Sequence, residues 1–75
     1  FGVDNNRNFG FHWGVAGSSP IACADTFHGK FASSEPETQA VENYVSENQK
    51  DLIAYLDVHA YSQLWMTPYG WTSSL

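Results

Sequence analysis

The feature that most constrains this chain is an apolar run from Leu52 to Val58 that ends abruptly in polar and turn-forming residues. The run has the length of a β-strand, and Asp57 is its one charged member. A strand that is apolar almost throughout is typical of a sheet covered on both faces. Because side chains alternate along a strand, Tyr55, Asp57 and His59 should share one face. We therefore predict a buried central strand that delivers His59 at its end.

His59 is the first candidate for chemistry because of this position. In open α/β sheets, ligands bind just beyond the carboxyl ends of the strands, where Asp57, His59, Tyr61 and Gln63 fall. On burial and hydrogen-bonding grounds alone, a histidine at a strand end is more often structural than functional. Most of the aromatic residues that follow, up to Trp71, are expected in a core, since aromatic side chains bury large areas.

The opening segment contains a cluster of turn-forming residues. Three asparagines and an aspartate lie between Asp4 and Asn8, a composition that favours turns over regular structure. A strand end that passes into a solvated polar loop, with Arg7 exposed, is the simplest explanation.

Residues 10–33 show no lasting helical or alternating pattern, but aromatic residues are interspersed among the glycines. This combination predicts a long ordered loop that packs against other structure. His12 and His28 lie in the loop without acidic or cysteine neighbours at ligand spacing, so metal binding is less favoured there than at His59.

A helix is predicted to start near Ser34. Ser34 can act as the N-cap, Pro36 is tolerated in the first turn, and Glu37 completes a capping box. Apolar residues then recur at helical spacing on one face, and the pattern ends at residues 48–50. The face comprises Ala40, Val41, Tyr44 and Val45. A helix followed directly by a strand belongs to an α/β fold, in which helices cover a sheet.

Size and charge narrow the class of protein. A domain of 75 residues buries only about 60% of its unfolded surface, which barely sustains a two-faced sheet. The sequence starts at Phe1, shows no signal-peptide pattern and has no apolar run near the ~20 residues that span a membrane. We therefore expect an internal piece of a larger domain. The net charge of −5 argues against nucleic acid or an anionic membrane as partner.

Three motifs in order carry a resemblance to a known family. Residues 59–64 and 67–70 (HAYSQL and TPYG) are similar to an HSYSQ…PYGY segment, residues 2–9 (GVDNNRNF) to GVDxNRNF, and residues 18–37 to SSPCSETYHGPxxxSEPE. Together they resemble the zinc metallocarboxypeptidases, the family of pancreatic carboxypeptidases A and B. The conjunction of the three is far more specific than any one of them.

The resemblance implies a secreted zinc exopeptidase that removes the last residue of a peptide or protein with a free C-terminus. It implies a three-layer α/β domain with a mixed central sheet flanked by helices. Residues 1–75 would be one internal fragment, supplying a strand end, a long loop, a helix, the central strand and a further loop. The catalytic residues and the other zinc ligands would come from the rest of the same domain, since no H-x-x-E motif occurs here.

The resemblance also implies roles for individual residues. His59 matches the third protein ligand of the catalytic Zn²⁺, in a site that keeps an open position for water. Asn6 and Arg7 match the residues that hold the substrate carboxylate, which suits a guanidinium with parallel N–H donors and an amide that adds another. Asp4 matches a carboxylate that orients another zinc-binding histidine. Tyr61 matches a tyrosine that lines the cleft.

Cys23 and two peptide bonds complete these expectations. Cys23 is unpaired within the chain, so it is either a buried free thiol or half of a disulfide with a cysteine elsewhere. The resemblance favours the disulfide, although Ile21-Ala22 interrupts the family pattern just before it. It also implies cis peptide bonds at Ala60-Tyr61 and Pro68-Tyr69. Ala60 and Trp71 replace the usual Ser and Tyr.

Two other functions stay open on the sequence. A noncatalytic carboxypeptidase-like domain would keep the fold and the carboxylate-binding Arg7 but lose the zinc or the catalytic base. A small self-contained binding module would require these residues to fold alone. His59 and Asp4 favour the enzyme over the first of these.

Overall fold

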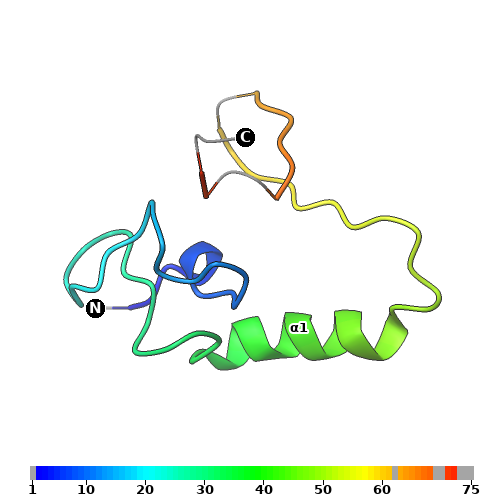
Figure 1. Cartoon of the computed structure of the whole chain (residues 1–75), viewed down its shortest axis with the longest axis horizontal. Helices are drawn as coiled ribbons and strands as arrows, with labels where there is room; N and C mark the ends of the chain where they lie inside the picture. The colour runs from blue at the N-terminus through cyan, green and yellow to red at the C-terminus, as the bar shows by residue number, and fades with distance from the viewer. Residues whose placement is uncertain (1, 62, 69–70, 73–75) are drawn as a thin grey trace.

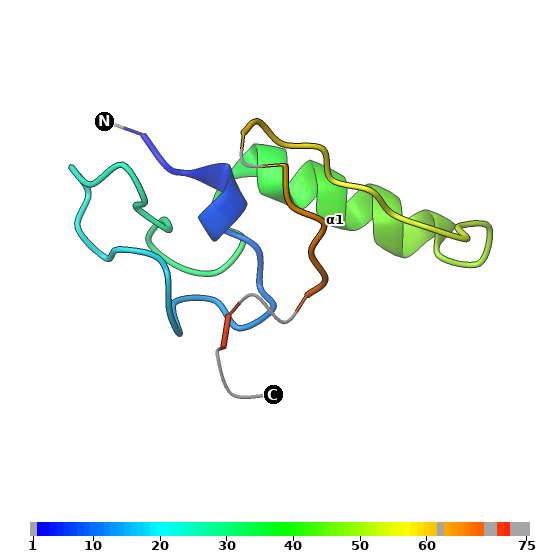
Figure 2. The ribbon, with the colours of Figure 1, turned by 90° about the horizontal axis from the view of Figure 1, so that it is seen from above.

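The computed structural model describes residues 2–61, 63–68 and 71–72. Its elements are a short 3-10 helix, η1 (Asn5–Arg7), and one α-helix, α1 (Pro36–Asn48). Loops on one side of the molecule lead into α1, and the chain then leaves the far end of the helix and runs back above it (Figures 1 and 2). No helix in the described part of the chain is long and apolar enough to cross a bilayer.

The predicted turn at the start of the chain is present as η1. Asp4 is its N-cap, and the carboxylate Oδ1 of Asp4 accepts a hydrogen bond from the Asn6 backbone N–H at 3.1 Å. The Arg7 and Asn8 backbone N–H groups donate to the carbonyls of Asp4 and Asn5 at 2.8 and 3.0 Å. The local side-chain acceptor that makes aspartate a turn former therefore shapes this segment.

Asn8 holds the long loop together. It is fully buried, and its Nδ2 donates to the His28 carbonyl at 2.9 Å and to Ser34 Oγ at 3.0 Å. Its Oδ1 accepts from the Glu35 N–H at 3.2 Å, and its carbonyl accepts from the Ser33 N–H at 2.7 Å. One side chain thus closes a loop of more than twenty residues, which confirms the prediction of an ordered loop.

Further contacts fold the loop onto itself. Ser19 and Phe27 form a parallel bridge, and the Phe27 carbonyl accepts from the Asp4 N–H at 2.9 Å, which joins the loop to η1. Trp13 Nε1 donates to the His28 carbonyl at 2.9 Å, and His28 Nδ1 lies 2.8 Å from Ser18 Oγ. His28 is therefore a buried structural residue of the loop, in line with its predicted role.

The start of α1 corrects the predicted cap. Glu35, not Ser34, is the N-cap, and its side chain makes no capping hydrogen bond. The Ser34 hydroxyl instead donates to Glu35 Oε2 at 2.7 Å and accepts from Asn8 Nδ2. The hydroxyl oxygen that would accept a capping hydrogen bond is therefore already bonded to Asn8. The helix therefore begins at Pro36, later than a cap at Ser34 would place it, and it ends at Asn48, within the predicted end at residues 48–50.

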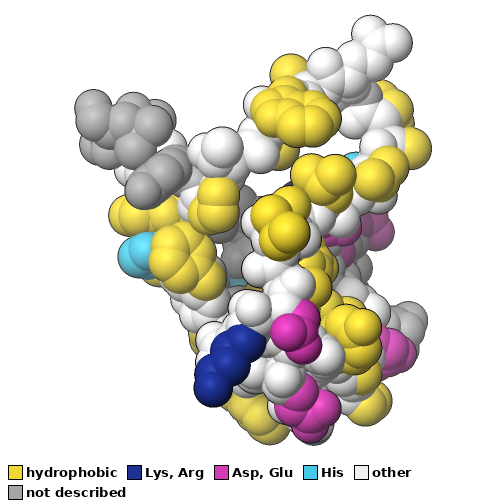
Figure 3. Space-filling view, turned by 90° about the vertical axis from the view of Figure 1, so that its right-hand side faces the viewer, with side chains coloured by type: hydrophobic (Ala, Val, Ile, Leu, Met, Phe, Trp, Pro, Cys, Tyr) yellow, Lys and Arg dark blue, Asp and Glu magenta, His cyan; other side chains and the backbone are white. Residues whose placement is uncertain are grey.

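Residues 52–58 form no strand in this structure, so the predicted central strand stays a prediction for the complete domain. Residues 52–58 are extended but exposed, and Val58 retains 90% of its accessible surface. A β-strand requires backbone hydrogen bonds to a neighbouring strand. Within the described residues, no segment makes such hydrogen bonds with residues 52–58. The described residues also contain no buried hydrophobic side chain, and Figure 3 shows hydrophobic side chains on the outside, around a hollow.

Candidate functional site

The first part of the candidate site is the turn η1, which places Asp4 and Arg7 together. Residues three apart lie on the same side of a 3-10 helix, and Arg7 Nε lies 3.6 Å from Asp4 Oδ2. Both side chains are partly exposed, so the ion pair contributes only about 0–1 kcal/mol. The ion pair matters for the position of Arg7, because the carboxylate that accepts from the Asn6 N–H also lies next to the guanidinium.

Arg7 keeps most of its hydrogen-bonding capacity. Its Nε is buried without a hydrogen-bond partner, and among the described residues its terminal nitrogens make no hydrogen bond either. A guanidinium carries five N–H donors in a planar fork that matches a carboxylate. Asn6 is exposed beside it on the same turn. The pair can therefore bind an external carboxylate without first breaking strong contacts.

The second part of the site is His59, which lies in the exposed extended segment. Its Nε2 is 3.0 Å from Asp57 Oδ2, and both side chains are about half exposed. In the part of the chain that the structure describes, Nδ1 of His59 makes no hydrogen bond. The ring can thus contact a carboxylate through one nitrogen and offer the other to a metal ion.

His59 fits zinc as a single ligand. Neutral imidazole is a common zinc donor, and a catalytic zinc takes three protein ligands and keeps one position open. The described residues contain no group of three His, Cys, Asp or Glu side chains that could hold a metal ion. His59 can therefore contribute to a zinc site only together with ligands from outside these described residues.

Tyr61 lies two residues after His59 and is almost fully exposed. The peptide bond between Ala60 and Tyr61 is cis, as the family resemblance predicts. The second expected cis bond, Pro68-Tyr69, lies outside the described residues. Tyr61 is therefore free to contact a ligand, and the backbone between it and His59 has the expected conformation.

The structure forms two separate clusters from the predicted residues. Asp4, Asn6 and Arg7 share one turn, while His59 is paired with Asp57. No hydrogen bond or ion pair joins the clusters within residues 2–61, 63–68 and 71–72. Asp4 also has lone pairs left, since a carboxylate accepts about four hydrogen bonds, so it can still orient a histidine from elsewhere.

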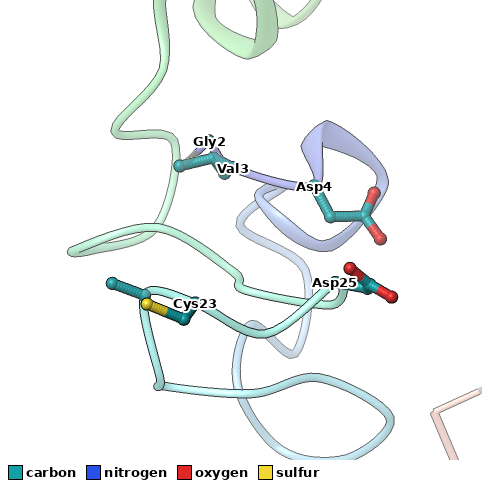
Figure 4. A pocket seen from close by; sticks show the side chains of 6 residues that line it. Gly2, Val3, Asp4, Cys23 and Asp25 are labelled. Carbon is teal, nitrogen blue, oxygen red and sulfur yellow. The ribbon is translucent and has the colours of Figure 1, made fainter.

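Cys23 is exposed and lines a shallow hollow of about 450 Å³. Asp4 and Asp25 lie on one side of this hollow and Cys23 on the other, as Figure 4 shows. An exposed thiol at the surface of the loop is accessible to a second cysteine, which is what a disulfide to another segment needs. The alternative of a buried thiol is wrong for this structure.

The sequence did not reveal the contacts of Asn8 and Asp57. Asn8 appeared only as one of several turn-forming asparagines, and its partners lie 20 to 27 positions away, so no local pattern identifies it. Asp57 had a visible signal, because it is the one charge within the apolar run from Leu52 to Val58. The sequence placed Asp57 on the face of His59 and at the ligand-binding end of the strand, but did not identify the two residues as partners.

Comparisons with known proteins cover the whole chain. The family model described as zinc carboxypeptidase matches residues 1–75. Zinc carboxypeptidase A 1 of Drosophila melanogaster is 47% identical over 75 residues, which are 100% of this chain and 17% of the relative. Carboxypeptidase B of Astacus astacus is 43% identical over 74 residues, 99% of this chain and 24% of the relative. Carboxypeptidase A1 of Bos taurus is 43% identical over 72 residues, 96% of this chain and 17% of the relative.

Proposed function

Because the chain belongs to the zinc carboxypeptidase family, we propose that it is an internal part of the catalytic domain of a zinc-dependent exopeptidase. The reaction is hydrolysis of the C-terminal peptide bond of peptides and proteins. The chain spans only 17% to 24% of the relatives compared above, so the remaining zinc ligands and the catalytic residues belong to other segments.

The observation that carries this proposal is the capped turn η1. An exopeptidase must recognise a free α-carboxylate, and Arg7 is the sole arginine of the chain. Asp4 supports the turn through its capping bond and its contact with Nε, and the terminal guanidinium nitrogens have no hydrogen-bond partner among the described residues. Arg7 binds the substrate carboxylate, and Asn6 adds an amide donor beside it.

His59 is the zinc ligand that this chain contributes, and Asp4 orients a histidine ligand from another segment. When bound, zinc polarises the scissile carbonyl and activates a water molecule near neutral pH. Tyr61 lines the cleft next to His59. The chain thus binds the end of the substrate at Arg7 and supplies a metal ligand at His59.

The complete domain is proposed to be a three-layer α/β structure in which residues 52–58 become a central strand. Both faces of that strand would then be covered by helices, among them α1. The protein is proposed to be secreted, with Cys23 in a disulfide to a cysteine outside this chain. Rapid labelling of Cys23 in the native, unreduced protein would contradict the disulfide.

The test of carboxylate recognition is Arg7→Ala in the complete protein. Loss of a charge-assisted pair in a partly dehydrated cleft costs about 2–5 kcal/mol, so kcat/KM on free-acid peptides should fall by tens to thousands of fold. Amidated peptides lack the carboxylate, so they should be poor substrates of the parent enzyme and lose little further. Lys30→Ala, which removes an exposed basic residue of the loop, should leave both values unchanged.

Equal losses on free-acid and amidated peptides would show that Arg7 only supports the loop. Arg7→Lys should recover part of the activity, since an ammonium cannot make two parallel hydrogen bonds. A complete protein that binds free C-termini through Arg7 but hydrolyses nothing would establish the noncatalytic binding domain instead.

A further inference from the structure

We infer that Asp57 is a positioning residue for His59: its carboxylate accepts a hydrogen bond from Nε2–H and thereby directs Nδ1 to the zinc. The inference rests on the proposed function, in which His59 is a zinc ligand. It adds a residue to the site that the three family motifs leave unassigned.

The sequence alone makes Asp57 unusual. It is the only charged residue between Leu52 and Val58. Removing a carboxylate from water without a partner is costly, so a charge in a segment that is otherwise suited to burial requires a compensating contact. Its position two residues before a histidine offers such a contact.

The geometry supplies the contact. Asp57 Oδ2 lies 3.0 Å from His59 Nε2, which is hydrogen-bond distance. No other polar partner of Asp57 occurs within the described residues. Asp57 also lines a groove of about 730 Å³, together with apolar residues such as Phe9 and Val41 and with the polar Glu42 and Ser46.

The contact is compatible with residues 52–58 forming a strand in the complete domain. Residues two apart on a strand point to the same face, with Cα atoms roughly 6.6 Å apart, a separation that aspartate and histidine side chains can bridge. Asp57 and His59 therefore remain neighbours whether or not the segment is paired with other strands.

The chemistry follows from the two nitrogens of imidazole. In the neutral ring one nitrogen is a donor and the other an acceptor. A carboxylate at Nε2 keeps the proton on Nε2, so the lone pair that can bind zinc lies on Nδ1. A carboxylate in this position also holds the orientation of the ring.

The test measures zinc affinity of the complete protein by competition with a chelator. Asp57→Ala should weaken zinc binding by about 10–100-fold, the usual effect of removing such a partner. Asp57→Asn has the same shape and keeps an acceptor without the charge, so it should give a smaller loss and guards against misfolding of the alanine variant. Asp51→Ala removes an exposed carboxylate from the same segment and should bind zinc like the parent.

A second readout is the tautomer of the bound ring. Nitrogen-15 spectra of the zinc-loaded protein, assigned by comparison with His59→Ala, should show the proton of His59 on Nε2 and the metal on Nδ1. Metal on Nε2, or unchanged zinc affinity in both Asp57 variants, would overturn the inference. Undiminished zinc in His59→Ala would instead overturn the proposed function, so the two failures are distinguishable.

Discussion

The loop region (residues 2–35) is polar but well connected by hydrogen bonds, whereas the returning segment (residues 51–68) is apolar but exposed. The loop region is rich in glycine, serine and asparagine, yet its side chains and backbone are joined by hydrogen bonds across more than twenty positions. The returning segment holds the most hydrophobic run in the chain, yet its described residues are all exposed. The region that looks irregular is therefore the one that is held in place.

The difference has a physical cause. The hydrogen bonds of the loop region close within this chain, because Asn8, His28 and Ser34 all lie in it. The returning segment needs partners for both its backbone and its apolar faces, and hydrophobic burial and strand pairing are non-local. A polar network can thus be complete where an apolar strand is not.

The largest effect is expected for Val58→Asp in the complete protein. If residues 52–58 become a buried strand, an unpaired carboxylate at Val58 should cost about 4 kcal/mol or more and prevent stable folding. Asn43→Asp, on the exposed surface of α1, should change the free energy of unfolding by no more than about 0.5 kcal/mol. Chemical unfolding measures both. Equal stability of the two variants would mean that the segment stays exposed, as it is here.

The next effect concerns Gly29, where the loop region is tightest. Its φ is +88°, and an added Cβ would lie 2.5 Å from both Asn8 Nδ2 and Ser34 Oγ. These atoms can move only by giving up their hydrogen bonds, so Gly29→Ala should destabilise by about 3 kcal/mol. Gly17 has a φ of +73° and open space around it, so Gly17→Ala should cost only about 1 kcal/mol. Equal shifts in unfolding midpoint would show that backbone conformation, and not the contact with Asn8, limits this position.

The smallest effect tests the polar network directly. Asn8→Ala removes the donor and the acceptor at the centre of the loop and leaves the Glu35 N–H without its side-chain partner, at a cost of about 2 kcal/mol. The His28 carbonyl keeps its bond from Trp13, which limits the loss. Asn48→Ala removes only an exposed bond to the Tyr44 carbonyl and should cost less than about 1 kcal/mol. Thermal unfolding under matched conditions compares the stabilities of the two variants. Indistinguishable unfolding midpoints would show that Asn8 is not central to the stability of the loop.

Much of the local structure and of the site could be predicted from the sequence. Asp4 and the asparagines after it indicated the turn, because the hydrogen bonds of a turn join near neighbours. The helix ends at Asn48, within the predicted residues 48–50. The motifs also identified the family, which the comparisons confirm over residues 1–75. The roles of Arg7 and His59 in binding and metal ligation stay predictions.

The sequence by itself determined the turn η1, the end of α1, the irregular course of residues 10–33 and the family, because each depends on residues close together or on motifs in order. Only the tertiary structure decided that Asn8 is the centre of the loop's hydrogen bonds. It also decided that the Ser34 hydroxyl accepts a hydrogen bond from Asn8 and does not cap the helix. It also decided that residues 52–58 are exposed. The reason is that a buried amide, or an apolar run, is satisfied by groups far away in the chain, whose positions no local pattern contains.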